Sequence, residues 1–277
     1  MMQHRTPTYF LSHGGPTLIE DTEHPAYAKL QEIGQEITTK VKPKAVIVFS
    51  AHWQGEPGTI EINAATTQDL IYDFYGFPRH LYAHKFPNTG SPELARRIQS
   101  LLGEAGIKSR KVSRGLDHGV WVSFSVAFNP QTNPLQVPLV QVSLYGNENP
   151  VMHYKLGKAL ETLRNEEVLI IGSGMAVHNL RDFRRSYGMT GAMPYAKSFD
   201  VALKQAAEVP SSERETALAT LLTRSDARQA HPTFEHLLPV HIAAGAAGDD
   251  SGKQLWTLPE GSLSWAMYRF GEVAGAA

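Results

Sequence analysis

The stretch Val168–Ser173, with the sequence VLIIGS, is the strongest strand signal in the chain. Runs of this kind are short, apolar and rich in β-branched residues, which favours a buried strand over a buried helix. Thr8–Ser12 and Ala45–Ser50 are similar runs, and Thr59–Asn63 and Pro138–Leu144 are further strand candidates. Strands that are apolar along their whole length are typical of a sheet that is covered on both faces.

Longer amphipathic stretches separate or follow these strands, and three of them carry a proline in the first turn, where proline is favoured. They predict helices at Pro25–Thr38, Pro92–Ala105, Val151–Arg164, Tyr195–Val209, Ser211–Thr223 and Pro232–Ala247. Gln254–Trp256 and Ser262–Tyr268 are predicted to be closing strands. This alternation predicts an α/β fold with a central, mostly parallel or mixed sheet flanked by helices. No linker-like segment divides the chain, so we expect a single domain over residues 1–277.

The composition excludes several classes of function. Of the 277 residues, 42% are hydrophobic, and 26 Lys and Arg nearly balance 27 Asp and Glu. A net charge of −1 argues against binding to nucleic acid or to an anionic membrane. Cysteine is absent, which excludes disulfides, thiolate metal sites and cysteine nucleophiles. The polar start, Met1–Arg5, lacks the apolar core of a secretion signal, so we expect a cytoplasmic protein.

A histidine follows each of three predicted strands. His13 comes directly after the first, His52 follows the second, and His178 follows Val168–Ser173. Open α/β sheets bind ligands at the carboxyl ends of their strands. A single histidine is more often structural, but three at equivalent positions favour a shared site.

Two further histidines have a distinctive context. His118 lies on a predicted turn in GLDHGVW, and His236 ends the stretch HPTFEH, in which His231 and Glu235 would lie one helical turn apart. Pro239 is expected to kink this helix. Neutral imidazoles without cysteine suit zinc, iron(II), copper or nickel, and they fit magnesium or calcium poorly. The spacing of the histidines does not choose among these metals.

Two other motifs carry weaker signals. Gly172-Ser173-Gly174 lacks the flanking glycines of a nucleophile elbow and the lysine of a phosphate-binding loop. The aromatic stretch Tyr72–Pro78 is either a packed surface loop or a wall that stacks on a planar substrate.

Taken together, six motifs resemble a known family. They are SHGGPTL, FSAHW, DFYGFP, RGLDHGVW, LIIGSGMAVHNL and HPTFEHLLPV, in this order between Ser12 and Val240. The set resembles the class III extradiol ring-cleavage dioxygenases of the DOPA-dioxygenase type, in the LigB-like superfamily of the protocatechuate 4,5-dioxygenase catalytic subunit. The resemblance implies one non-haem metal ion per chain, Fe(II) or Zn(II).

Site residues follow from the same resemblance. It implies that His13, His52 and His236 are metal ligands, that His178 is a further ligand or an acid/base, and that His118 faces substrate and oxygen. Protocatechuate-type enzymes use two histidines and a glutamate, so Glu235 and His231 compete with His236 here. Glu235 is favoured at a helix start by the helix dipole alone. We therefore expect His236 to be the ligand.

The implied reaction is oxidative cleavage, with O2, of the ring of a catechol-type small molecule to give a ring-opened semialdehyde. His118 and His178 are the expected catalytic residues of this aromatic breakdown. Two alternatives stay open: a zinc hydrolase with a metal-bound hydroxide, and a metal- or small-molecule-binding protein without turnover. We expect no nucleic-acid or membrane partner, and a monomer or small homo-oligomer.

Overall fold

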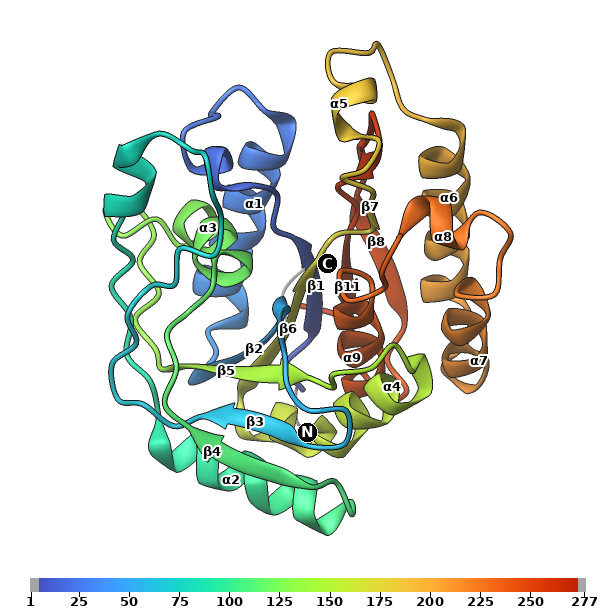
Figure 1. The fold of residues 1–277 in the computed structure, drawn as a ribbon. Helices are drawn as coiled ribbons and strands as arrows, with labels where there is room; N and C mark the ends of the chain where they lie inside the picture. Colours follow the sequence, from blue (N-terminus) through green and yellow to red (C-terminus); the bar gives the residue numbers. More distant parts are fainter. Residues whose placement is uncertain (1–4, 274–277) are drawn as a thin grey trace.

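A mixed sheet of eight strands, in the order β4-β3-β5-β2-β6-β1-β11-β8, forms the centre of the computed structural model, which describes residues 5–273 (Figure 1). Its strands are β1 (Thr8–Ser12), β2 (Ala45–Gln54), β3 (Ile60–Asn63), β4 (Ser109–Val112), β5 (Leu139–Leu144), β6 (Val168–Gly174), β8 (Gly252–Trp256) and β11 (Met267–Phe270). The four central strands β5, β2, β6 and β1 are parallel, whereas β3 and β11 run antiparallel to their central neighbours. The predicted single α/β domain with a mixed sheet is confirmed.

A second, small sheet has the order β7-β10-β9, with β7 (Val177–His178), β9 (Pro259–Glu260) and β10 (Leu263–Ser264). It continues from the end of β6 and returns the chain to β11. The predicted strand Ser262–Tyr268 is therefore two strands, β10 and β11, which belong to different sheets.

Helices cover both faces of the large sheet. They are α1 (Pro25–Glu36), α2 (Pro92–Glu104), α3 (His118–Ala127), α4 (Pro150–Ala159), α5 (Phe183–Ser186), α6 (Pro194–Glu208), α7 (Ser211–Leu221), α8 (Ala227–Ala230) and α9 (Leu238–Ala246). Side-chain caps fix several starts: Ser91 accepts a hydrogen bond from Leu94 N at α2, and Asn149 accepts one from Met152 N at α4. No helix among residues 5–273 is long and apolar enough to cross a membrane.

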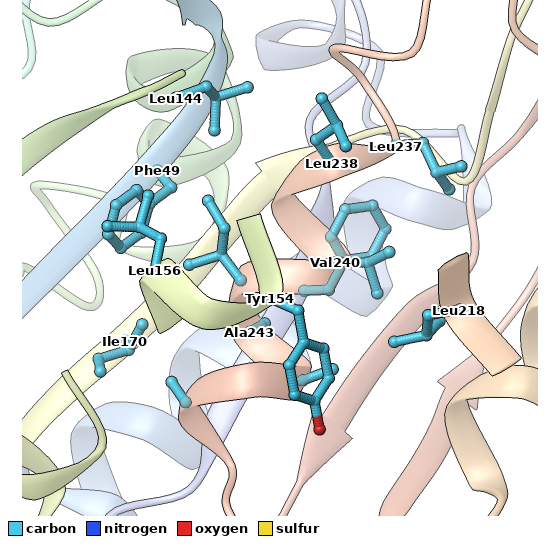
Figure 2. Close-up of a cluster of buried hydrophobic side chains, with 14 of the residues drawn as sticks. Phe49, Leu144, Tyr154, Leu156, Ile170, Leu218, Leu237, Leu238, Val240 and Ala243 are labelled. Carbon is cyan, nitrogen blue, oxygen red and sulfur yellow. The ribbon is translucent and has the colours of Figure 1, made fainter. Parts of the chain in front are cut away.

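The two faces of the sheet form two separate cores because successive strand residues point to opposite sides. In β2, Val46 and Val48 pack under α1 and α3, whereas Ile47 and Phe49 pack under α4 and α9. Figure 2 shows part of this second core, where Phe49 lies near side chains of α4, β6 and α9. Strands buried on both sides explain the continuous apolar runs in the sequence.

Two predicted helices had wrong bounds, and one helix was missed because His118 was predicted to lie on a turn. The predicted helix Pro232–Ala247 begins only at Leu238, because Pro239 occupies its first turn, and residues 231–237 form turns instead. The expected kink at Pro239 is therefore absent. Val151–Arg164 is divided into α4 and a 3₁₀ helix, Glu161–Glu166. The apolar run after His118 is the fully buried helix α3, which shows no polar face to reveal it.

The polar start Met1–Arg5 falls mainly on residues 1–4, which, like residues 274–277, lie outside the described residues.

Candidate active site

Five histidines gather where the central strands end. His13 follows β1, and its ring centroid lies 5.0 Å from that of His52, 5.3 Å from that of His236 and 5.7 Å from that of His118. His178 stacks on His236 at 3.5 Å, with the two rings nearly parallel. The sequence spreads these residues widely. The parallel strands bring His13 and His52 to one edge of the sheet, where the start of α3 adds His118 and the segment between α8 and α9 adds His236.

His13 is buried, and its two ring nitrogens have different surroundings. Its Nδ1 lies 2.7 Å from the carbonyl oxygen of Gly14, a hydrogen bond that places the proton on Nδ1. Its Nε2 is buried without a hydrogen-bond partner. A buried nitrogen with a free lone pair is costly unless something binds it, so this atom indicates a ligand position.

His52 and His236 face each other through their Nε2 atoms, which are 3.2 Å apart. Behind each ring, Nδ1 meets a carboxylate: His236 Nδ1 lies 2.9 Å from Glu235 Oε1, and His52 Nδ1 lies 3.3 Å from Asp73 Oδ2. Metal-binding histidines typically pair their outer nitrogen with a carboxylate, which orients the ring and makes the inner nitrogen a better donor.

His118 is the first residue of α3, and Asp73 holds it as well. Asp73 Oδ1 accepts the backbone N–H of His118 at 2.9 Å and lies 2.9 Å from its Nδ1. His118 is also 4.0 Å from His52 between ring centroids. Asp73 thus links two site histidines from one loop.

Two groups of donor atoms are compact enough to hold a metal ion. In each group the atoms lie within 4.8 Å of one another: one is His13, His52 and His118, and the other is His178, Glu235 and His236. The close approach of His52 and His236 joins the two groups into one site.

Burial holds four of the site histidines, His13, His118, His178 and His236, in the neutral state. Burial, reinforced by the neighbouring imidazoles, lowers the pKa of His13 and of His236 well below the usual value. Burial likewise lowers the pKa of His178 to about 3, and that of His118 less far because Asp73 opposes it. Burial would raise the pKa of Asp73, but His118 and His52 lower it far more, so this carboxylate stays ionised.

The motif Gly172-Ser173-Gly174 serves packing at this site. A Cβ on Gly174 would lie 2.1 Å from the carbonyl oxygen of His236, and a Cβ on Gly172 would lie 2.2 Å from that of Pro239. The two glycines therefore let the segment with His236 approach β6, where Met175 N donates to His236 O at 2.9 Å.

His231 and the aromatic loop Tyr72–Pro78 differ in how they relate to the histidine cluster. His231 is fully buried and its Nε2 donates to Ala176 O at 2.9 Å, away from the cluster. It does not lie one helical turn from Glu235, because this segment is not helical. In the Tyr72–Pro78 loop, Phe74 is buried against His118 with ring centroids 5.7 Å apart, whereas Tyr75 is 90% exposed.

Sequence reasoning missed Asp73 and Asp117. The buried Asp117 accepts hydrogen bonds from Ser50, Arg114 and Gln141, and so fixes the start of α3 beneath His118. Asp73 lies in the aromatic motif DFYGFP, and Asp117 lies in the histidine motif GLDHGVW. The local sequence does not show which side chains these carboxylates contact.

Comparison with known proteins assigns the class. Residues 6–269 match the family described as the catalytic LigB subunit of aromatic ring-opening dioxygenase. The chain belongs to this family, and it is an extradiol dioxygenase.

Its relatives include named enzymes. The chain is 39% identical over 269 residues to a 4,5-DOPA dioxygenase extradiol of Beta vulgaris, covering 95% of this chain and 96% of that protein. It is 32% identical to a 4,5-DOPA dioxygenase extradiol of Escherichia coli strain K12, covering 98% and 97%. The crystal structure of an uncharacterized Escherichia coli K12 protein matches with a TM-score of 0.78 and 29% identity, covering 96% of this chain and all of that one.

Proposed function

We propose that the protein is a metal-dependent extradiol dioxygenase that opens the ring of a catecholic substrate with O2 to give a semialdehyde. The observation that carries the metal dependence is the cluster of imidazoles around the buried, unpartnered Nε2 of His13. The names of the relatives support a dihydroxyphenyl compound such as DOPA as the first substrate to test.

The donor set fits one metal ion. For bonds of 2.0–2.1 Å in tetrahedral geometry, two ligand nitrogens should lie about 3.3 Å apart. The two Nε2 atoms of His52 and His236 are 3.2 Å apart, and the carboxylates behind them support deprotonated inner nitrogens. We assign His13, His52 and His236 as ligands, with His178 as a further ligand or proton carrier.

When bound there, the metal ion supplies Lewis acidity and, in the case of iron, the electrons for reaction with O2. The protein supplies position and proton transfer. The neutral rings of His118 and His178 each have a lone pair with which to accept a phenolic proton of the catechol, and the same ring can later return it. The buried ring of Phe74 packs beside His118 and gives this side of the site an apolar surface.

The first experiment identifies the metal and the reaction. Metal-free protein is loaded with Fe(II) or Zn(II) under anaerobic conditions and then mixed with DOPA and other catechols in an oxygen electrode. Oxygen consumption with a yellow semialdehyde product only after Fe(II) loading is the expected result. Ester or amide hydrolysis by the Zn(II) form would favour the zinc hydrolase, and catechol binding without product would favour a binding protein.

The third ligand needs its own test, because Glu235 is also near. His236→Ala should lose most metal affinity, whereas His231→Ala should keep it, since His231 lies away from the cluster. Glu235→Gln should keep a metal but bind it more weakly. Loss of metal in Glu235→Gln with retention in His236→Ala would assign the carboxylate as the ligand instead.

Four further features belong to the same proposal. The near-neutral charge supports small-molecule substrates and O2 as the only partners, without nucleic acid. We propose one catalytic domain that spans the chain, in a cytoplasmic monomer or small homo-oligomer.

A further inference from the structure

The segment that carries His236 has no regular secondary structure. Residues 231–237, here called the 231–237 turn, connect α8 to α9. A segment without helical or sheet hydrogen bonds has to be fixed by contacts from elsewhere if it is to hold a side chain in place. The hydrogen bonds that other segments make to its backbone therefore add to its own turn bond, Leu237 N to Phe234 O at 2.9 Å, in fixing where His236 lies.

The inner side of the 231–237 turn is fixed by the end of β6. His236 O accepts the N–H of Met175 at 2.9 Å, and the buried His231 ring donates to Ala176 O at 2.9 Å. These contacts hold both ends of the turn against the sheet. In its middle, the Phe234 side chain is buried in the apolar core, while the Phe234 N–H is bound from the other side.

The outer side is fixed by an ion pair whose acid comes from a distant part of the chain. Glu148, in the loop between β5 and α4, accepts the backbone N–H of Phe234 at 2.8 Å through Oε1. Arg228, in α8, donates to both oxygens of Glu148, at 3.2 and 2.7 Å. Its guanidinium also lies 3.8 Å from the ring centroid of Phe234 and donates to Pro232 O at 3.3 Å.

The ion pair alone would contribute little to stability. The side chains of Arg228 and Glu148 are 56% and 35% exposed, and pairs of this kind typically contribute about 0–1 kcal/mol. What distinguishes this pair is that each member also contacts the 231–237 turn, Glu148 through a backbone N–H and Arg228 through a ring and a carbonyl.

We propose that Glu148 and Arg228 are positioning residues for the metal site: they hold the 231–237 turn so that His236 Nε2 faces His52 Nε2. This inference rests on the proposed metal site. Glu148 acts by accepting the Phe234 N–H, and Arg228 fixes the orientation of that carboxylate while it covers the Phe234 ring. Neither residue touches the five histidines.

The test compares three variants by chelator competition for Zn(II) and by thermal unfolding of the metal-free protein. Glu148→Ala removes both contacts, and Glu148→Gln keeps an oxygen that can accept the Phe234 N–H. The matched control is Glu166→Ala, which removes an ion pair with Arg97 of similar exposure, 41% and 43%, near the start of β6.

Glu148→Ala should lower Zn(II) affinity about 10-fold or more, as is typical when the support of a metal ligand is lost. Its melting temperature without metal should fall no further than that of Glu166→Ala. Glu148→Gln should recover most of the affinity. The proposal is overturned if Glu148→Ala binds Zn(II) like the wild type, if Glu166→Ala weakens binding equally, or if Glu148→Gln is as weak as Glu148→Ala.

Hydrogen exchange separates failure of this inference from failure of the proposed function. If wild-type protein binds no Zn(II), the metal site itself is wrong. Amide exchange in metal-free protein still tests the positioning. Peptides covering residues 231–237 should exchange faster in Glu148→Ala than in the wild type, and at the wild-type rate in Glu166→Ala. Equal exchange in both variants would overturn the role of Glu148 whatever the metal result.

Discussion

Acidification should unfold this protein through three buried histidines that lie outside the metal cluster. His153, His231 and His241 each donate one ring N–H to a backbone carbonyl, of Asn149, Ala176 and Leu218 respectively. Burial lowers the pKa of each ring from 6.5 to about 4. All three are therefore neutral in the folded protein at pH 7.

The sign follows from proton uptake. Between pH 6.5 and 4 the unfolded chain binds protons on these rings and the folded chain does not, so acid favours unfolding. Each neutral ring thus contributes its full stabilisation above pH 6.5 and loses about 1.4 kcal/mol per pH unit below it. Over the interval down to about 4 this amounts to about 3 kcal/mol per ring, against a typical total stability of about 5–15 kcal/mol.

The assay is urea unfolding of metal-free protein at pH values from 7.5 to 5. His241→Gln keeps a donor for Leu218 O but does not titrate. As the pH is lowered below 6.5, its free energy of unfolding should therefore decrease less steeply than that of the wild type, and the two slopes should differ by about 1.4 kcal/mol per pH unit. His80→Gln, at a side chain that is 58% exposed, is the surface control. Equal slopes for His241→Gln and the wild type would refute the reasoning.

Three further predictions concern the site. His52→Ala should remove most bound metal, whereas His118→Ala should retain the metal and slow turnover. If His118→Ala also bound no metal, we would assign His118 as a ligand, which its position beside His13 and His52 permits. Asp73→Asn should lower metal affinity about 10- to 100-fold in chelator competition, because one carboxylate orients two rings; unchanged affinity would contradict that role. Gly174→Ala should destabilise the protein by about 1–3 kcal/mol in urea unfolding and weaken metal binding, since its Cβ would meet the His236 carbonyl; wild-type behaviour would show that the 231–237 turn moves freely.

The central strands could be predicted because a strand that is buried on both faces has a continuous apolar sequence. Ala45–Ser50 and Val168–Ser173 are apolar on both faces since both faces are covered, and the structure extends them by only a few residues. The positions of His13 and His52 at the ends of such strands followed from the same pattern.

Elements governed by distant contacts escaped prediction. Helix α3 is apolar all round, so it has no periodicity to recognise. Residues 231–237 combine a proline, a threonine and an acid in the order expected of a helix start, but the chain there follows β6 and Glu148 instead. Asp73 meets His118 across 45 residues, and no local pattern could pair them.

The placement of the five histidines has a consequence for how the protein is made. The site draws on residues from His13 to His236, so a growing chain on the ribosome has no complete donor set until it has been synthesised as far as His236. A metal ion that needs all of these ligands could therefore be held only after the chain has passed His236, and its binding would stabilise the folded form.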